Sequence, residues 1–200
     1  MNNQKQPKNF NVPNTLTMFR IFIIPIIMVM LTHEGFWINL FTGILFLIAS
    51  LTDIVDGYIA RKYNLITNLG KILDPLADKL LVLTALIMLI PLDRVPAWMV
   101  AVIVLRETGV TSLRAVAAAD GTVIAASFLG KYKNMFQVIA TLFLIVHHNY
   151  QVITINDFPI SFNFHAAGIL VMWIALIFTV WSGVDYFFKL YGESKDSPLD

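Results

Sequence analysis

The chain has 200 residues, of which 58% are apolar and 14% charged, and its mean hydropathy is +0.73. This composition excludes an ordinary soluble domain, and the formal net charge is +1. The absence of cysteine excludes disulfides, thiolate catalysis and cysteine sulfur as a metal ligand. We therefore expect an all-α, polytopic membrane protein, embedded in membrane lipids and with no nucleic acid among its partners.

Six apolar segments follow one another along the chain and predict a bundle of six transmembrane helices. Several of their apolar cores are shorter than the roughly 20 residues of a membrane span, so polar helix ends must lie at membrane depth. A polar arm at 1–13 and a flexible cytoplasmic tail at 191–200 flank a single predicted domain at 14–190. The predicted segments are 14–31, 36–60, 72–92, 96–119, 132–148 and 165–190.

The distribution of basic residues predicts the orientation of the bundle. If the N-terminus lies inside, 13 of the 14 lysines and arginines fall on the same side of the membrane, and Arg94 is the exception. Basic residues collect on the cytoplasmic side of membrane proteins, so we expect both termini in the cytoplasm.

Four aspartates mark the candidate site, within the pattern D-x2-D-G-x2-A-R-x8-G-x3-D-x3-D that starts at Asp53. Asp53 and Asp56 are three residues apart at the end of the second segment, and Asp74 and Asp78 are four apart at the start of the third. A tight hairpin brings the two pairs face to face. Four carboxylates near a bilayer core favour a site for Mg²⁺ or Mn²⁺ that shares its coordination with a substrate diphosphate.

The remaining positions of the motif suit a phosphate-bearing substrate. Gly57 and Ala60 are small enough for a nucleotide or diphosphate to approach the backbone, and Arg61 supplies a cation for a phosphate oxygen. Gly70 allows the linker to turn or to contact a flat base. An alternative interpretation of Asp74, just before a proline, is a simple helix N-cap.

Further cations predict a second anion site. Arg106 and Arg114 lie eight residues apart, on roughly one face of a helix, and Lys131 and Lys133 begin the next segment at the same membrane level. Together they predict a pocket for a phosphate on the acceptor substrate. The alternative is that they are anchors at the cytoplasmic surface, and for Lys133 both interpretations stay open.

The motif that begins at Asp53 matches without a departure the signature of the CDP-alcohol phosphatidyltransferase family. The stretches VPNTLTMFRIFIIP, DPLADKLLV, RETGVTSLR and LGKYK resemble its bacterial branch that makes phosphatidylglycerophosphate. The resemblance runs through about the first 140 residues. It implies a six-helix enzyme of the bacterial inner membrane that moves the phosphatidyl group of CDP-diacylglycerol to sn-glycerol 3-phosphate and releases CMP.

The resemblance also implies roles for individual residues. Asp53, Asp56 and Asp74 are expected to bind two Mg²⁺ or Mn²⁺ ions, and Asp78 is expected to be the general base and to touch a metal. A homodimer is expected. Inositol phosphate, phosphatidylglycerol or serine as the acceptor stays open, whereas a prenyltransferase with aspartate motifs in separate halves and an ion transporter fit the pattern less well.

Overall fold

The structure is a computed structural model that describes residues 12–63, 68–119, 128–155 and 158–196. The side chains of Asp56, Ala60 and Arg61 lie outside this description, although their backbone belongs to a described helix. The described part of the chain contains six helices and one two-stranded sheet. In chain order these are α1 (Val12–Leu31), α2 (Phe36–Lys62), α3 (Asn68–Leu89), α4 (Ala97–Ala119), α5 (Phe128–Val146), β1 (Asn149–Ile155), β2 (Phe158–Asn163) and α6 (Phe164–Asp196).

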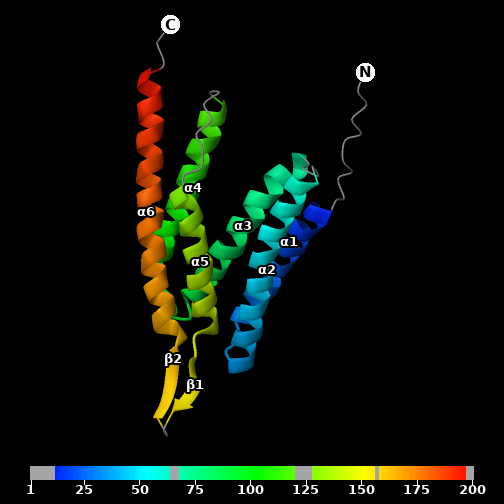
Figure 1. Ribbon diagram of the computed structural model, residues 1–200, viewed down its shortest axis with the longest axis vertical. Helices are drawn as coiled ribbons and strands as arrows, with labels where there is room; N and C mark the ends of the chain where they lie inside the picture. Colours follow the sequence, from blue (N-terminus) through cyan, green and yellow to red (C-terminus); the bar gives the residue numbers. More distant parts are fainter. Residues whose placement is uncertain (1–11, 64–67, 120–127, 156–157, 197–200) are drawn as a thin grey trace.

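Successive helices run in opposite directions along one elongated bundle (Figure 1). As a result α1 begins and α6 ends at the same end of the molecule, which we call the terminal end. The two strands and the link between α3 and α4 lie at the other end, which we call the hairpin end. The end of α2 and the start of α3 lie toward the terminal end (Figure 1), and Asp53 belongs to the second half of α2 and Asp74 to the first half of α3.

All six helices contribute side chains to one buried core. Close packing of these large apolar side chains stabilises the bundle through van der Waals contacts between the helices. Helices α5 and α6 approach especially closely at Gly168, where a Cβ atom would lie 2.9 Å from the Leu144 side chain and 3.2 Å from its backbone nitrogen. Representative core residues, one from each helix in order, are Ile27, Phe46, Leu86, Ile103, Leu144 and Met172.

The outer surface of the bundle is apolar as well. Phe22, Trp37, Leu105, Leu170 and Phe188 are each between 65% and 71% exposed. Large apolar surfaces of this kind mark contact with a membrane or a partner. By length and composition, the windows Phe36–Asp53 of α2 and Phe164–Lys189 of α6 are suited to cross a membrane. These findings indicate a membrane protein.

The described part of the chain is mainly helical with six helices, as predicted, and the short strands β1 and β2 are an addition to the predicted helices. They pair in antiparallel fashion, with Tyr150 opposite Phe162 and Ile155 opposite Phe158, and the register shifts between Gln151 and Ile153. The sequence analysis treated this stretch as the link between the last two helices. The physical reason for the sheet is local, because β1 is rich in the β-branched residues that favour extended backbone.

Helix α6 continues past the predicted end of the sixth segment. Residues 191–196, predicted as part of a flexible tail, form its last turns, since the helix ends only at Asp196. The sequence has no proline between Pro159 and Pro198, and Glu193 and Lys195 have good helix propensity. The predicted boundaries of the domain itself stay a prediction.

Arg94 joins three parts of the fold at the hairpin end. Its side chain is almost completely buried, and its Nη1 donates to the backbone oxygen of Ile145 at 2.9 Å and to Asn39 Oδ1 at 3.3 Å. The link between α3 and α4 is thereby fastened to α2 and α5. The basic residue that was the exception to the charge asymmetry therefore has a structural role.

Candidate functional site

Helix α1 holds one carboxylate from each of the next two helices. Arg20 Nη1 donates to Asp53 Oδ1 of α2 at 2.5 Å, and Thr17 Oγ1 donates to Asp74 Oδ1 of α3 at 2.6 Å. Thr17 and Arg20 are fully buried and lie one helical turn apart on α1. The two halves of the aspartate motif therefore meet against the same face of the first helix.

Asp78 follows Asp74 by one turn of α3, and the charges of Asp53 and Arg20 act on its carboxylate. Asp53 is close enough to Asp78 for the two negative charges to repel, and the positive charge of Arg20 partly offsets this repulsion. The structure thus places Asp53 and Asp74 against α1, with Asp78 one turn farther along α3. The side chain of Asp56, on the same helix as Asp53, lies outside the described part.

The chemistry of these donors suits a hard divalent cation, because carboxylate oxygens are the ligands that Mg²⁺ and Mn²⁺ prefer. Among the described residues, no three His, Cys, Asp or Glu side chains form a group that could hold a metal ion. The predicted set of four ligands includes Asp56, so the described residues do not test it. The metal site stays a prediction at this stage.

The alternative interpretation of Asp74 as a helix N-cap is wrong. Helix α3 begins at Asn68, so Asp74 lies two turns inside it rather than at its start. Asp74 therefore has no free helix end to cap. Its carboxylate instead accepts the hydrogen bond from Thr17.

The other positions of the motif are described only in part. Gly57 is half-buried on α2 and Gly70 is buried on α3. Ala60 and Arg61 follow on α2, but their side chains lie outside the description. Binding of a nucleotide or diphosphate by these four residues stays a prediction.

A basic pocket of about 220 Å³ lies between α3, α4, α5 and α6. All four cations that were predicted to bind the acceptor phosphate line it, together with two lysines that the sequence analysis did not select. Two of the described residues that line the same pocket are acidic, Glu107 and Asp185. Its described basic residues are Lys79, Arg106, Arg114, Lys131, Lys133 and Lys189.

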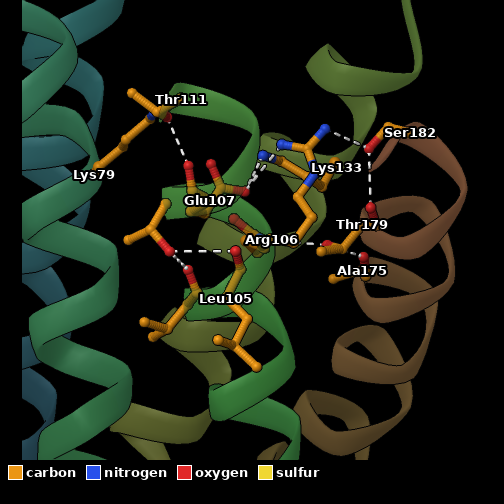
Figure 2. A network of polar contacts seen from close by, with 12 residues as sticks. Lys79, Leu105, Arg106, Glu107, Thr111, Lys133, Ala175, Thr179 and Ser182 are labelled. Carbon is orange, nitrogen blue, oxygen red and sulfur yellow. Dashed lines mark hydrogen bonds and ion pairs between the residues drawn. The ribbon is translucent and has the colours of Figure 1, made fainter. Parts of the chain in front are cut away.

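Glu107 organises the inner wall of the basic pocket (Figure 2). Its Oε1 accepts from Arg106 Nη1 at 3.3 Å and also pairs with Lys133 Nζ. The second guanidinium nitrogen of Arg106, Nη2, donates to Ser182 Oγ of α6 at 2.7 Å. Lys79 lies at the edge of the same network, where its Nζ donates to Thr111 Oγ1. Partners on α4 and α6 therefore hold these cations in place.

The interpretation of Lys133 as a simple surface anchor does not agree with its position. An anchoring lysine extends its ammonium group into the polar surface layer, whereas Lys133 is only 3% exposed and is paired with Glu107. A buried cation needs such a partner to offset the loss of hydration. Lys133 is part of the pocket wall.

Two polar atoms of the pocket wall have no hydrogen-bond partner in the described part of the chain. They are the hydroxyl group of Tyr186 and Nε of Arg106, and both are buried. The Arg114 guanidinium lies over the Tyr186 ring, 5.7 Å from its centre. Gly183 leaves room for Arg106 to lie against α6, since a Cβ there would be 3.3 Å from Arg106 Cγ. These donors leave the pocket suited to bind an anion.

A second, much smaller cavity lies between this pocket and Asp78. Asp78 and Gln137 line it, and Lys79, Glu107 and Asn134 line both it and the basic pocket. The three shared residues place the two cavities side by side. The predicted general base is therefore next to the predicted phosphate pocket, a relation that spacing along the sequence does not reveal.

Sequence reasoning missed Thr17, Arg20, Glu107 and Lys79 as members of the site. For Arg20 the sequence held a signal, because a cation in an apolar segment needs a partner at membrane depth. Thr17 has no comparable signal. Glu107 follows Arg106 directly in the sequence and was not assigned to the site. Its pairing with Lys133 joins residues 26 positions apart and follows from how α4 and α5 pack.

Comparison with known proteins gives a consistent result. The family model for CDP-alcohol phosphatidyltransferase matches residues 10–181. A Bacillus subtilis protein named CDP-diacylglycerol--glycerol-3-phosphate 3-phosphatidyltransferase is 46% identical over 200 residues, which cover 94% of this chain and 99% of the relative. Proteins of the same name from Rickettsia typhi and Salmonella choleraesuis are 38% and 32% identical, over 88% and 94% of this chain and 95% and 98% of the relatives.

Proposed function

Because this chain belongs to the CDP-alcohol phosphatidyltransferase family, we propose that it is a CDP-diacylglycerol--glycerol-3-phosphate 3-phosphatidyltransferase. It transfers the phosphatidyl group of CDP-diacylglycerol to the primary hydroxyl of sn-glycerol 3-phosphate, giving phosphatidylglycerophosphate and CMP. The names of relatives that match almost the whole chain support both substrates.

The observation that carries the choice of acceptor is the position of the basic pocket beside Asp78. An acceptor with its own phosphate needs cations beyond those that bind the donor, and six basic side chains line this pocket. Arg106, Lys133 and the buried hydroxyl of Tyr186 are its best enclosed donors. Serine carries no phosphate, so a pocket of this charge fits glycerol 3-phosphate better.

We assign the binding of the donor substrate, CDP-diacylglycerol, to the aspartate motif. We assign two divalent ions, Mg²⁺ or Mn²⁺, to the carboxylates of Asp53, Asp56, Asp74 and Asp78, where they would neutralise charge on the diphosphate of CDP-diacylglycerol. The general dependence of this family on divalent metals supports the assignment. Thr17 and Arg20 orient two of these carboxylates. The residues that we assign to the donor's nucleotide and diphosphate are Gly57, Ala60, Arg61 and Gly70.

Asp78 acts as the general base in this proposal. Its carboxylate takes the proton from the primary hydroxyl of the acceptor as the hydroxyl oxygen attacks the β-phosphorus of CDP-diacylglycerol. A new phosphorus–oxygen bond forms, the bond to the bridging oxygen breaks, and CMP leaves with that electron pair. The small cavity that Asp78 lines, beside the basic pocket, supports a place there for the reacting hydroxyl of the acceptor.

We further propose that all six helices cross the bacterial inner membrane, with both termini and the site on the cytoplasmic side. The common position of the start of α1 and the end of α6 supports an even number of crossings (Figure 1). The apolar outer surface supports lipid contact around the bundle, and a homodimer through part of it is also proposed. Arg94 at the opposite end is buried, so it adds no exposed positive charge there.

A panel of acceptors tests the proposed function. Purified protein is supplied with CDP-diacylglycerol, Mg²⁺ and glycerol 3-phosphate, serine, inositol phosphate or phosphatidylglycerol, and CMP release is followed for each. We expect glycerol 3-phosphate to be preferred and all turnover to disappear with EDTA. Preference for serine contradicts the acceptor assignment, and full turnover in EDTA contradicts the metal assignment.

A further inference from the structure

Glu107 is an unexpected residue for a pocket that binds a phosphate. Its negative charge repels the ligand that the surrounding cations attract, and its side chain is only 6% exposed. One of its oxygens, Oε1, forms the bonds to Arg106 and Lys133. The other, Oε2, accepts no hydrogen bond from any described residue. The two cations thus occupy Oε1, and Oε2 is available to a ligand.

The position of Glu107 indicates which group of the acceptor its Oε2 contacts. Among the acidic residues described, Glu107 alone lines both the basic pocket and the small cavity that contains Asp78. The acceptor has three polar groups in order: a phosphate, a secondary hydroxyl and the primary hydroxyl that reacts. With the phosphate in the basic pocket and the primary hydroxyl at Asp78, the secondary hydroxyl lies at the boundary of the two cavities.

We propose that Glu107 is a specificity-determining residue that accepts a hydrogen bond from the secondary hydroxyl of the acceptor. This inference rests on the proposed function. Asn134 lines the same boundary and can complete the contact from α5. Glu107 thus has two roles, since Oε1 holds the two cations in place and Oε2 recognises a hydroxyl that takes no part in the reaction.

The expected consequence is discrimination against an acceptor that lacks this hydroxyl. A hydrogen bond to a charged group contributes about 1.5–3 kcal/mol, and a binding site built for a hydroxyl is left with an unpaired carboxylate when the hydroxyl is missing. The corresponding loss in kcat/KM is about 10- to 150-fold.

The first experiment uses the wild-type enzyme. Its kcat/KM is measured for glycerol 3-phosphate and for 3-hydroxypropyl phosphate, which has the same phosphate and primary hydroxyl but no secondary hydroxyl. We expect a preference for glycerol 3-phosphate of tenfold or more. A smaller preference overturns the proposal, whatever any variant does.

The second experiment assigns the preference to Glu107. In Glu107→Met, which removes the acceptor atoms at similar size, we expect the ratio of the two kcat/KM values to fall at least fivefold. Asp185→Asn is the matched control, because it also removes one negative charge from the basic pocket but lies away from the small cavity. Its ratio should stay within twofold of wild type.

A purely structural role gives a different result. If Glu107 only positioned Arg106 and Lys133, its loss would weaken both acceptors equally and leave the ratio unchanged, which overturns the proposal. If Glu107→Met does not fold, Glu107→Gln replaces it with an expected fall of at least threefold, since a neutral amide is a weaker acceptor than a carboxylate. Failure of the proposed function is distinct, because the wild-type enzyme would then not use glycerol 3-phosphate.

Discussion

Loss of the ion pair between Arg20 and Asp53 should destabilise the bundle measurably. The Arg20 Nη1 and Asp53 Oδ1 atoms are 2.5 Å apart, and the two side chains are 0% and 34% exposed. Two unit charges about 4 Å apart interact by about 4 kcal/mol at an effective dielectric constant of about 20. The partial exposure of Asp53 lowers this value, so we expect Arg20→Met to cost about 2–3 kcal/mol.

Thermal unfolding in detergent measures this cost. For a chain of this length 1 kcal/mol corresponds to about 2–4 °C, so the midpoint should fall by about 4–12 °C. A double-mutant cycle with Asp53→Asn isolates the pair from other effects of the substitution. The double variant should be more stable than the sum of the single effects by about 1 kcal/mol or more.

An exposed ion pair of the same chain provides the control. Lys189 and Asp185 pair at 2.8 Å on α6, with side chains 49% and 28% exposed. The same cycle with Lys189→Met and Asp185→Asn should give a coupling of only about 0.3–0.5 kcal/mol. If the Arg20 cycle gives no more than this control, the argument that α1 holds the aspartate site electrostatically is refuted.

Three further predictions concern catalysis. Asp56→Asn should abolish CMP release while the protein stays folded in detergent, and near-normal turnover of this variant would refute its role as a metal ligand. Asp78→Asn should lower kcat by about 10² to 10⁴-fold with little change in CDP-diacylglycerol affinity, and equal losses in both would make it a ground-state ligand instead. Arg106→Ala should raise the KM for glycerol 3-phosphate tenfold or more, and Arg114→Ala should raise it less because Arg114 is exposed. An unchanged KM in both would remove these arginines from the acceptor site.

The helical segments were predictable from the sequence because long apolar runs have few alternatives. The second and fourth segments were placed almost as observed, since α2 begins at Phe36 and α4 ends at Ala119. The β-hairpin was not predicted. Its alternating apolar and polar residues are a weaker signal than an apolar run, and they follow directly on a helix of similar composition.

The candidate site was predictable as two groups of residues but not as one arrangement. The spacing of Asp74 and Asp78 and of Arg106 and Arg114 marked helix faces, because helical periodicity is local. The position of Glu107 between Arg106 and Lys133 depends on how α4 packs beside α5 and α6. Contacts of this kind depend on tertiary structure, and the spacing of residues along the sequence does not predict them.

The bond from Arg20 to Asp53 also bears on how the chain is made. Arg20 leaves the ribosome 33 residues before Asp53, and Thr17 leaves it 57 residues before Asp74. A first helix that carries a buried arginine has no stable place in a lipid bilayer until its acidic partner arrives. In our proposed topology, α1 therefore completes its insertion only together with the hairpin of α2 and α3. We therefore expect the contacts of α1 with Asp53 and Asp74 to make the first three helices a single unit of membrane assembly.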